Sequence, residues 1–154
     1  MEFVLVHGST QSSAGWDRLA TASGTRGHQV TVIDLPPGRP EWTMADYARE
    51  ASAQAGEPSG RRVVVGHSAA GSCCPPSQRP PRRAAAWLAA YIPDLAGGHS
   101  MAEDILPTGD RTLRPGWMRQ AARQRLGTQP VEVNTGHCPH VSQPEVIADI
   151  LAQT

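Results

Sequence analysis

Residues with the functional groups needed for acyl transfer follow the predicted strands of this chain: Ser68, Asp110 and His137, together with Asp34 and Asp94. A serine hydroxyl becomes a useful nucleophile when a base takes its proton, and a histidine base needs an acid that orients its ring and stabilises the cation. Functional groups of a parallel sheet gather at the carboxyl ends of its strands. The chain therefore contains the residue types of a serine nucleophile, its base and the accompanying acid at positions where they can meet.

Ser68 stands in the segment Val63–Gly71, where a β-branched run ends in a turn of small residues. A buried strand followed by a tight turn and a helix is the context in which a Gly-x-Ser-x-Gly elbow lifts a serine hydroxyl out of the backbone. The match is partial, because Ala70 occupies the position of the second glycine and Gly71 follows one residue later. The pattern alone is also compatible with an ordinary turn serine.

The elements that must position these residues alternate between strand and helix. Short apolar runs predict strands, and apolar residues at helical spacing predict helices. The predicted strands cover residues 3–6, 30–33, 63–65, 84–92, 105–106 and 131–133, and the predicted helices cover 13–26, 43–55, 115–126 and 144–151. Alternation at this spacing is typical of parallel βαβ units. We expect an α/β fold, a three-layer sandwich around a mostly parallel sheet of about six strands, in a single domain spanning residues 1–154.

One stretch does not fit this pattern. Residues 72–83 should hold the helix that follows the elbow, yet they include Pro75, Pro76, Pro80 and Pro81. An interior proline costs a helix about 3 kcal/mol. We therefore expect this helix to end near Cys74 or not to form.

Composition excludes several classes of function. The 154 residues carry no net charge, so we expect no positive electrostatic potential that would attract nucleic acid or an anionic membrane. No apolar run approaches the roughly 18 residues of a membrane span, and the chain opens directly on a predicted strand, so we expect no signal peptide and a cytoplasmic protein. Three cysteines, two of them adjacent, form no disulfide framework, and their spacing to the histidines matches no familiar zinc site. We expect no metal, no cofactor and a small-molecule substrate.

Five blocks of the chain, taken in order, resemble the α/β-hydrolase superfamily, and most closely its branch of small bacterial esterases, plant methyl esterases and hydroxynitrile lyases. The blocks are Leu5–Ser9, Val65–Gly71, Trp87–Pro93, Thr108–Arg111 and Thr135–Glu145. The resemblance implies that Ser68 is the nucleophile, His137 the general base and Asp110 its acid. It also implies an oxyanion hole made by the backbone N–H groups of Ser9 and Ala69.

Two of these assignments have competitors in the sequence. Asp94 also follows a strand and is the alternative acid, and His140, three residues after His137, is the alternative base. His7 and His67 flank the two turns, and we expect them to be structural. His28 and His99 are expected at the surface, and the four tryptophans are expected to be packing residues.

The chain departs from the family in the region where relatives insert a helical cap over the pocket. Only the short segment Asp94–Asp104 connects the corresponding strands here. The lyases carry a threonine at the position of Gly8 and a lysine at that of Cys138, so hydrolysis fits better than lyase chemistry. The expected function is a serine hydrolase of the carboxylesterase type that cleaves a small ester or amide through an acyl-enzyme. The missing cap and the prolines favour an alternative, a degenerate hydrolase that binds a ligand without turnover. A third hypothesis is perhydrolysis by the same triad.

Overall fold

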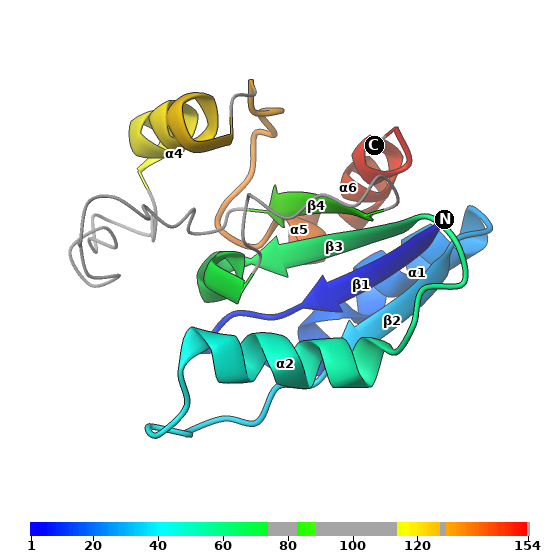
Figure 1. Cartoon of the computed structure of the whole chain (residues 1–154). Helices are drawn as coiled ribbons and strands as arrows, with labels where there is room; N and C mark the ends of the chain where they lie inside the picture. The colour runs from blue at the N-terminus through cyan, green and yellow to red at the C-terminus, as the bar shows by residue number, and fades with distance from the viewer. Residues whose placement is uncertain (74–82, 89–113, 127–128, 154) are drawn as a thin grey trace.

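A parallel four-stranded sheet forms the centre of the computed structural model, which describes residues 1–73, 83–88, 114–126 and 129–153. The strand order is β2-β1-β3-β4 (Figure 1). The strands are β1 (Glu2–Val6), β2 (Gln29–Ile33), β3 (Arg62–His67) and β4 (Arg83–Leu88). Val6 pairs in register with Ile33 on one side and with Gly66 on the other, so the chain leaves β1, β2 and β3 at the same edge of the sheet.

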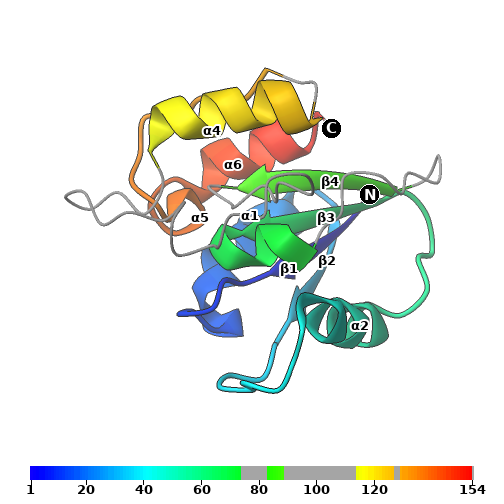
Figure 2. The same ribbon diagram turned by 60° about the vertical axis from the view of Figure 1, so that its left-hand side comes forward.

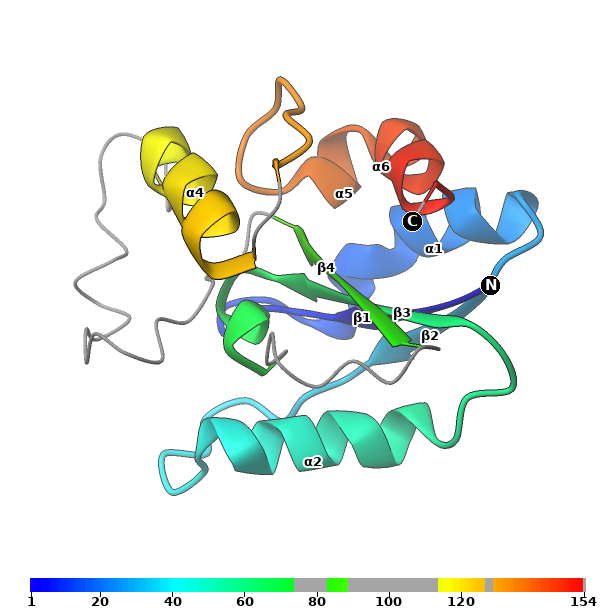
Figure 3. The same ribbon diagram turned by 45° about the horizontal axis from the view of Figure 1, so that its top comes forward.

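Helices cover both faces of the sheet (Figures 2 and 3). On one face lie η1 (Ser13–Trp16), α1 (Asp17–Thr25), α5 (Pro139–Ser142) and α6 (Pro144–Leu151); on the other lies α2 (Met44–Ala55). The short 3-10 helix η2 (Ser68–Cys73) follows β3, and α4 (Pro115–Ala121) continues as the π-helical turn η3 (Ala122–Leu126). The structure thus confirms an α/β fold with a helix layer on each side of the sheet.

Alternation along β1 divides the core between the two faces. Phe3 and Leu5 pack with Trp16 of η1 and with the buried face of α6. Val4 and Val6 point the other way and pack with Ile33 and the residues beneath α2, among them Leu35 and Ala70. Both faces are apolar, as a parallel sheet covered on both sides requires.

The predicted start of α2 is confirmed in detail. Thr43 is the N-cap, its hydroxyl accepts a hydrogen bond from the Asp46 backbone N–H at 3.3 Å, and the Asp46 carboxylate accepts one from the Thr43 N–H at 2.7 Å. This reciprocal pair satisfies two backbone donors that a helix otherwise leaves open. The first turn of α2 is therefore fixed in place.

Two arginines form ion pairs that attach the helices to the sheet and to each other. The buried Arg62 guanidinium binds the Glu2 carboxylate through two hydrogen bonds of 2.7 and 2.9 Å. The same guanidinium donates to the carbonyls of Ala55 and Gly56, which end α2. On the other face, Arg26 binds Glu145 and Asp149 and so joins α1 to α6.

The expected strand at 131–133 is wrong. These residues form no strand, the Val131 side chain is 69% exposed, and Glu132 instead binds Arg119 of α4 at 2.6 Å. A run of three residues makes few ladder bonds, so its β-branched composition alone does not hold it in a strand. The described residues therefore hold four strands rather than six, and the expected strand at 105–106 and residues 89–92 of another lie outside the described part of the chain.

The expected helices at 13–26, 115–126 and 144–151 are confirmed, with η1 and η3 as non-α portions at one end of two of them. In α6, Ile147, Ala148 and Leu151 are buried, and Val146 is 43% exposed. After the elbow the chain forms 3-10 rather than α-helix up to Cys73, and the proline-rich continuation lies outside the described residues. Within the described residues, no helix is long and apolar enough to cross a membrane.

Candidate functional site

Ser68 has a backbone conformation that few side chains adopt. It follows β3 directly as the first residue of η2, with φ of 52°, and among the described residues it alone has a positive φ without being glycine. This left-handed conformation costs a non-glycine residue about 1–2 kcal/mol. Strain of this kind, on a serine at a strand-to-helix turn, is the geometry of a nucleophile elbow.

The turn after β1 lies directly against this elbow. A Cβ placed on Gly8 would lie 2.9 Å from Ser68 Cβ, 3.2 Å from the His67 carbonyl oxygen and 3.4 Å from Ser68 Oγ. Only glycine allows so close an approach. The contact brings the backbone of Ser9, the residue after Gly8, to the neighbourhood of the serine, and Ser9 and Ala69 line the same cavity.

His67 joins three segments that are distant in the sequence. Its fully buried ring lies with Nδ1 2.6 Å from Gln11 Oε1, in the turn after β1, and with Nε2 2.8 Å from the His137 carbonyl oxygen. The ring centroids of His67 and His137 are 4.8 Å apart. The structure therefore brings His137 against the residue that precedes Ser68.

Burial lowers the pKa of His67 to about 3, so its ring is neutral at pH 7. A neutral imidazole carries one ring proton, and both atoms that its nitrogens face, Gln11 Oε1 and the His137 carbonyl oxygen, are acceptors. Gln11 Oε1 also accepts a hydrogen bond from the Gly8 N–H at 3.3 Å. The other end of this amide lies 3.3 Å from Cys138 Sγ. Gln11 thus links the turn after β1 to the His137 loop, and no sequence motif pointed to it.

The two candidate bases have different surroundings. His140 is fully buried in α5, with its ring 4.3 Å from that of Trp16 and 4.5 Å from that of His67. Burial lowers the pKa of His140 to about 4, and its Nδ1 finds no hydrogen-bond partner among the described residues. His137 is only half-buried, in the loop before α5. His140 is therefore a core residue, whereas His137 is partly exposed to solvent.

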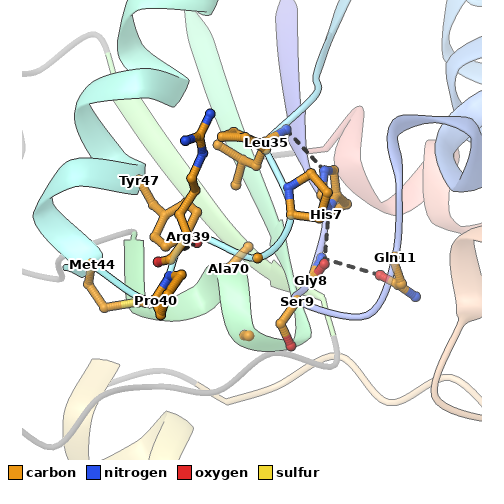
Figure 4. Close-up of a pocket in the computed structure, with 14 residues that line it drawn as sticks. His7, Gly8, Ser9, Gln11, Leu35, Arg39, Pro40, Met44, Tyr47 and Ala70 are labelled. Carbon is orange, nitrogen blue, oxygen red and sulfur yellow. Dashed lines mark hydrogen bonds between the residues drawn. The ribbon is translucent and has the colours of Figure 1, made fainter. Parts of the chain in front are cut away.

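His7 is structural, as its place beside the turn suggested. Its Nδ1–H donates to the Gly8 carbonyl at 2.8 Å, and its Nε2 accepts from the Leu35 N–H at 3.1 Å (Figure 4). The ring thus ties the turn after β1 to the segment after β2. Asp34, another carboxylate at this edge, is 73% exposed and 4.0 Å from His7 Nε2.

The remaining expectations meet the structure only in part. Asp110 and Asp94, the two candidate acids, and His99 lie outside the described residues. His28, expected at the surface, is half-buried with its ring 5.1 Å from that of Phe3. Within the described part of the chain, no group of three or more potential metal ligands is found.

A cavity of about 340 Å³ adjoins the elbow, on the α2 side of the sheet (Figure 4). It is lined by His7, Gly8, Ser9, Gln11, residues 35–40, Met44, Tyr47, Ala69 and Ala70. The only local sign of this cavity in the sequence is the run Leu35–Pro40, whose three prolines interrupt regular structure between β2 and α2.

The sequence of residues 3–90, more than half of the chain, matches the family model described as "Alpha/beta hydrolase family". The chain belongs to the alpha/beta hydrolase family. The matched residues of this alpha/beta hydrolase contain the whole described sheet, the elbow and the cavity lining. Comparison with curated protein sequences gives no match.

Solved structures of other alpha/beta hydrolases share the fold. A pyrethroid hydrolase from Sphingobium faniae JZ-2 superposes with a TM-score of 0.68 at 16% identity, covering 99% of this chain and 96% of that one. An extracellular alpha/beta-hydrolase from a Paenibacillus species gives 0.57 at 20% identity, covering 97% and 64%. Polyneuridine aldehyde esterase gives 0.51 at 28% identity over 60% of this chain and 41% of its own. The match to that esterase therefore spans less than half of its length.

Proposed function

We propose that this alpha/beta hydrolase is a serine hydrolase of the carboxylesterase type, acting on a small ester or amide through an acyl-enzyme. The observation that carries the proposal is the left-handed backbone of Ser68, at the junction of β3 and η2, with Gly8 against its side chain. Nothing in the packing of a simple turn requires a serine to bear this strain. A nucleophile that must project from a tight turn does require it.

In the proposed mechanism, Ser68 Oγ attacks the acyl carbonyl while His137 takes its proton. The oxyanion forms beside the backbone N–H groups of Ser9 and Ala69, and each such donor is worth about 3 kcal/mol to the transition state. His137 then returns the proton to the departing alcohol or amine, leaving an acyl-serine. A water molecule, deprotonated by His137, attacks that ester and releases the carboxylic acid and the free serine.

The surroundings of the histidines support His137 as the base. A base has to exchange protons with substrate and water, which the half-buried loop position of His137 allows. His140 is sealed between Trp16 and His67, and its lowered pKa makes it a poor proton acceptor at neutral pH. Asp110 remains the proposed acid on the strength of its sequence block. Two of the similar structures are named as a hydrolase and an esterase, which agrees with ester cleavage.

A second candidate function is ligand binding without turnover. The short connection at residues 94–104, where relatives carry a cap, favours it, because water that enters the site weakens the electrostatic stabilisation of the transition state. The cavity beside the elbow would then serve for binding alone.

A fluorophosphonate probe tests the proposed function, because it reacts with an activated serine. We expect labelling of one residue, Ser68, identified by mass spectrometry, and hydrolysis of p-nitrophenyl acetate. Ser68→Ala should abolish both, whereas Ser59→Ala, at an exposed serine in the connection before β3, should leave both unchanged. Folded protein that is neither labelled nor active would favour the binding function, and labelling at another serine would refute the assignment.

A further inference from the structure

The cavity of about 340 Å³ lies next to the atoms that would hold the oxyanion. Ser9 and Ala69 form part of its lining, and the rest comes from the turn after β1, the segment between β2 and α2, the first turn of α2 and η2 (Figure 4). A substrate whose carbonyl oxygen faces these two residues would therefore have one of its two substituents beside the cavity. The residues of the cavity wall determine the chemistry of the substituent that fits, and the position of His137 determines whether it is the acyl group or the leaving group.

The walls are largely apolar. They include Leu35, Pro36, Pro37, Pro40, Met44 and Ala70. Among the polar groups that border the cavity, both ring nitrogens of His7 are hydrogen-bonded, and the Tyr47 hydroxyl donates to the Arg39 carbonyl at 3.5 Å. The exposed Arg39 guanidinium lies 3.9 Å from the Glu41 carboxylate and 5.9 Å from the centroid of the Trp42 ring. Because most of the wall is apolar, a charged or strongly polar substituent would lose more water than these few groups replace, so the cavity suits an uncharged apolar group.

The cavity and His137 lie on opposite sides of the elbow. His137 contacts His67, whose ring also faces Trp16 and His140, and these belong to the layer of η1 and α5. Met44 and Tyr47 line the cavity from α2, which covers the other face of the sheet. The leaving group must be near His137, which returns its proton. The acyl substituent therefore points toward the cavity.

The volume limits the length of that substituent. One water occupies about 30 Å³ of liquid, and a methylene group is of similar size, so a chain of four to eight carbons, roughly 120–240 Å³, fits the cavity of about 340 Å³ loosely. We propose that this cavity is the acyl pocket of the hydrolase, and that its preferred substrates are esters or amides of uncharged apolar acids with about four to eight carbons. This inference rests on the proposed function, because it takes Ser68 as the nucleophile and His137 as the base.

Chain length is the variable that tests the pocket. With p-nitrophenol as the constant leaving group, kcat/KM should rise from the acetate through the butyrate to the hexanoate, by up to about fourfold for each methylene that enters the cavity. It should rise no further, or fall, at the dodecanoate. As a test of orientation, ethyl hexanoate should be cleaved faster than hexyl acetate. The reverse order would place the leaving group in the cavity and overturn the assignment.

Met44→Trp is the informative variant, because Met44 is the first residue of α2 and is already 45% exposed, so a larger side chain can fill the mouth of the cavity without disturbing the core. It should lower kcat/KM for the hexanoate about tenfold and for the acetate less than twofold. Val146→Trp, on α6 at 43% exposure, is the matched control and should change neither. An equal loss of kcat/KM for the hexanoate and the acetate in Met44→Trp would refute the assignment of this cavity as the acyl pocket.

Binding to Ser68→Ala separates this inference from the proposed function. By equilibrium dialysis, the inactive variant should bind p-nitrophenyl hexanoate at least tenfold more tightly than the acetate, and adding Met44→Trp should remove the difference. Wild-type protein that is labelled at Ser68 but shows no chain-length preference would overturn the acyl pocket and leave the serine hydrolase standing. Absence of labelling and hydrolysis would overturn the proposed function, and equal binding of the two esters by Ser68→Ala would then overturn the pocket as well.

Discussion

Gly8→Ala is the change that most directly tests the contact between the β1 turn and the elbow. The added methyl group would lie 2.9 Å from Ser68 Cβ and 3.2 Å from the His67 carbonyl oxygen, so either the turn or the elbow must move by several tenths of an ångström. The elbow cannot move freely, because the His67 ring is held by Gln11 and by the His137 carbonyl. Overpacking of this kind costs about 1–3 kcal/mol of stability.

The effect on catalysis should exceed the effect on stability. A misplacement of about 1 Å between reacting groups can cost about 100-fold in rate, so a shift of several tenths of an ångström should cost roughly tenfold or more. We therefore expect Gly8→Ala to lower kcat for p-nitrophenyl butyrate by about 10- to 100-fold while the protein still unfolds cooperatively in urea, with a lower midpoint. The rate of fluorophosphonate labelling at Ser68 should fall in parallel.

Gly24→Ala is the matched control. Gly24 lies in α1, and a Cβ there meets no atom within 4 Å. An alanine in a helix interior is favoured over glycine by about 0.5–1 kcal/mol, so this variant should be slightly more stable and fully active. Gly8→Ala protein with the wild-type rate and midpoint would refute the close approach and, with it, the oxyanion turn built on that approach.

Three further predictions concern stability. Burial lowers the pKa of His67 to about 3 and that of His140 to about 4, from 6.5 in the unfolded chain. Below pH 6.5 the unfolded chain therefore binds more protons than the folded one. The free energy of unfolding should be unaffected above pH 6.5 and should fall by up to about 1.4 kcal/mol per pH unit for each histidine on acidification toward pH 4. His140→Phe should make this slope shallower in urea titrations at pH 7 and pH 5, and an unchanged slope would contradict the assignment. Glu2→Gln leaves the buried Arg62 without its carboxylate and should cost about 3–5 kcal/mol in urea unfolding, whereas a loss under 0.5 kcal/mol would show the pair to be solvated. Ser68→Gly should be more stable than Ser68→Ala by about 1 kcal/mol, because only glycine adopts a positive φ without strain, and a more stable alanine variant would exclude the left-handed elbow.

The layer architecture was predictable because it depends on local patterns. Short apolar runs and amphipathic segments located all four described parallel strands and the helices on both faces, and the helix predicted at 43–55 begins at its N-cap, Thr43. The segment at 131–133 was misjudged because β-branched residues favour a strand only where a neighbouring strand is available to pair. Here Glu132 binds Arg119 of α4 instead.

The candidate site was predictable where it is local in the sequence and missed where it depends on tertiary contacts. The residues around Ser68 predicted an elbow. The structure adds the positive φ of Ser68 and the close approach of Gly8, and neither can be predicted from a local sequence pattern. Gln11 belongs to no recognised pattern, and its importance comes from a contact with His67, 56 residues away. The cavity was missed for the same reason, because its walls come from four separate segments.

The segment between β2 and α2 is anchored at both ends, and this has a consequence for engineering. At one end the Leu35 N–H donates to His7, and at the other the Thr43–Asp46 capping box fixes the start of α2. The seven residues 36–42 between these anchors supply Pro36, Pro37 and Pro40 to the cavity but do not belong to the strands or to the hydrogen bonds that hold the elbow. This segment can therefore be replaced without changing the sheet or the elbow. Loops of other lengths and sequences, inserted between Leu35 and Thr43, would change the cavity wall and so the ligands that the cavity binds.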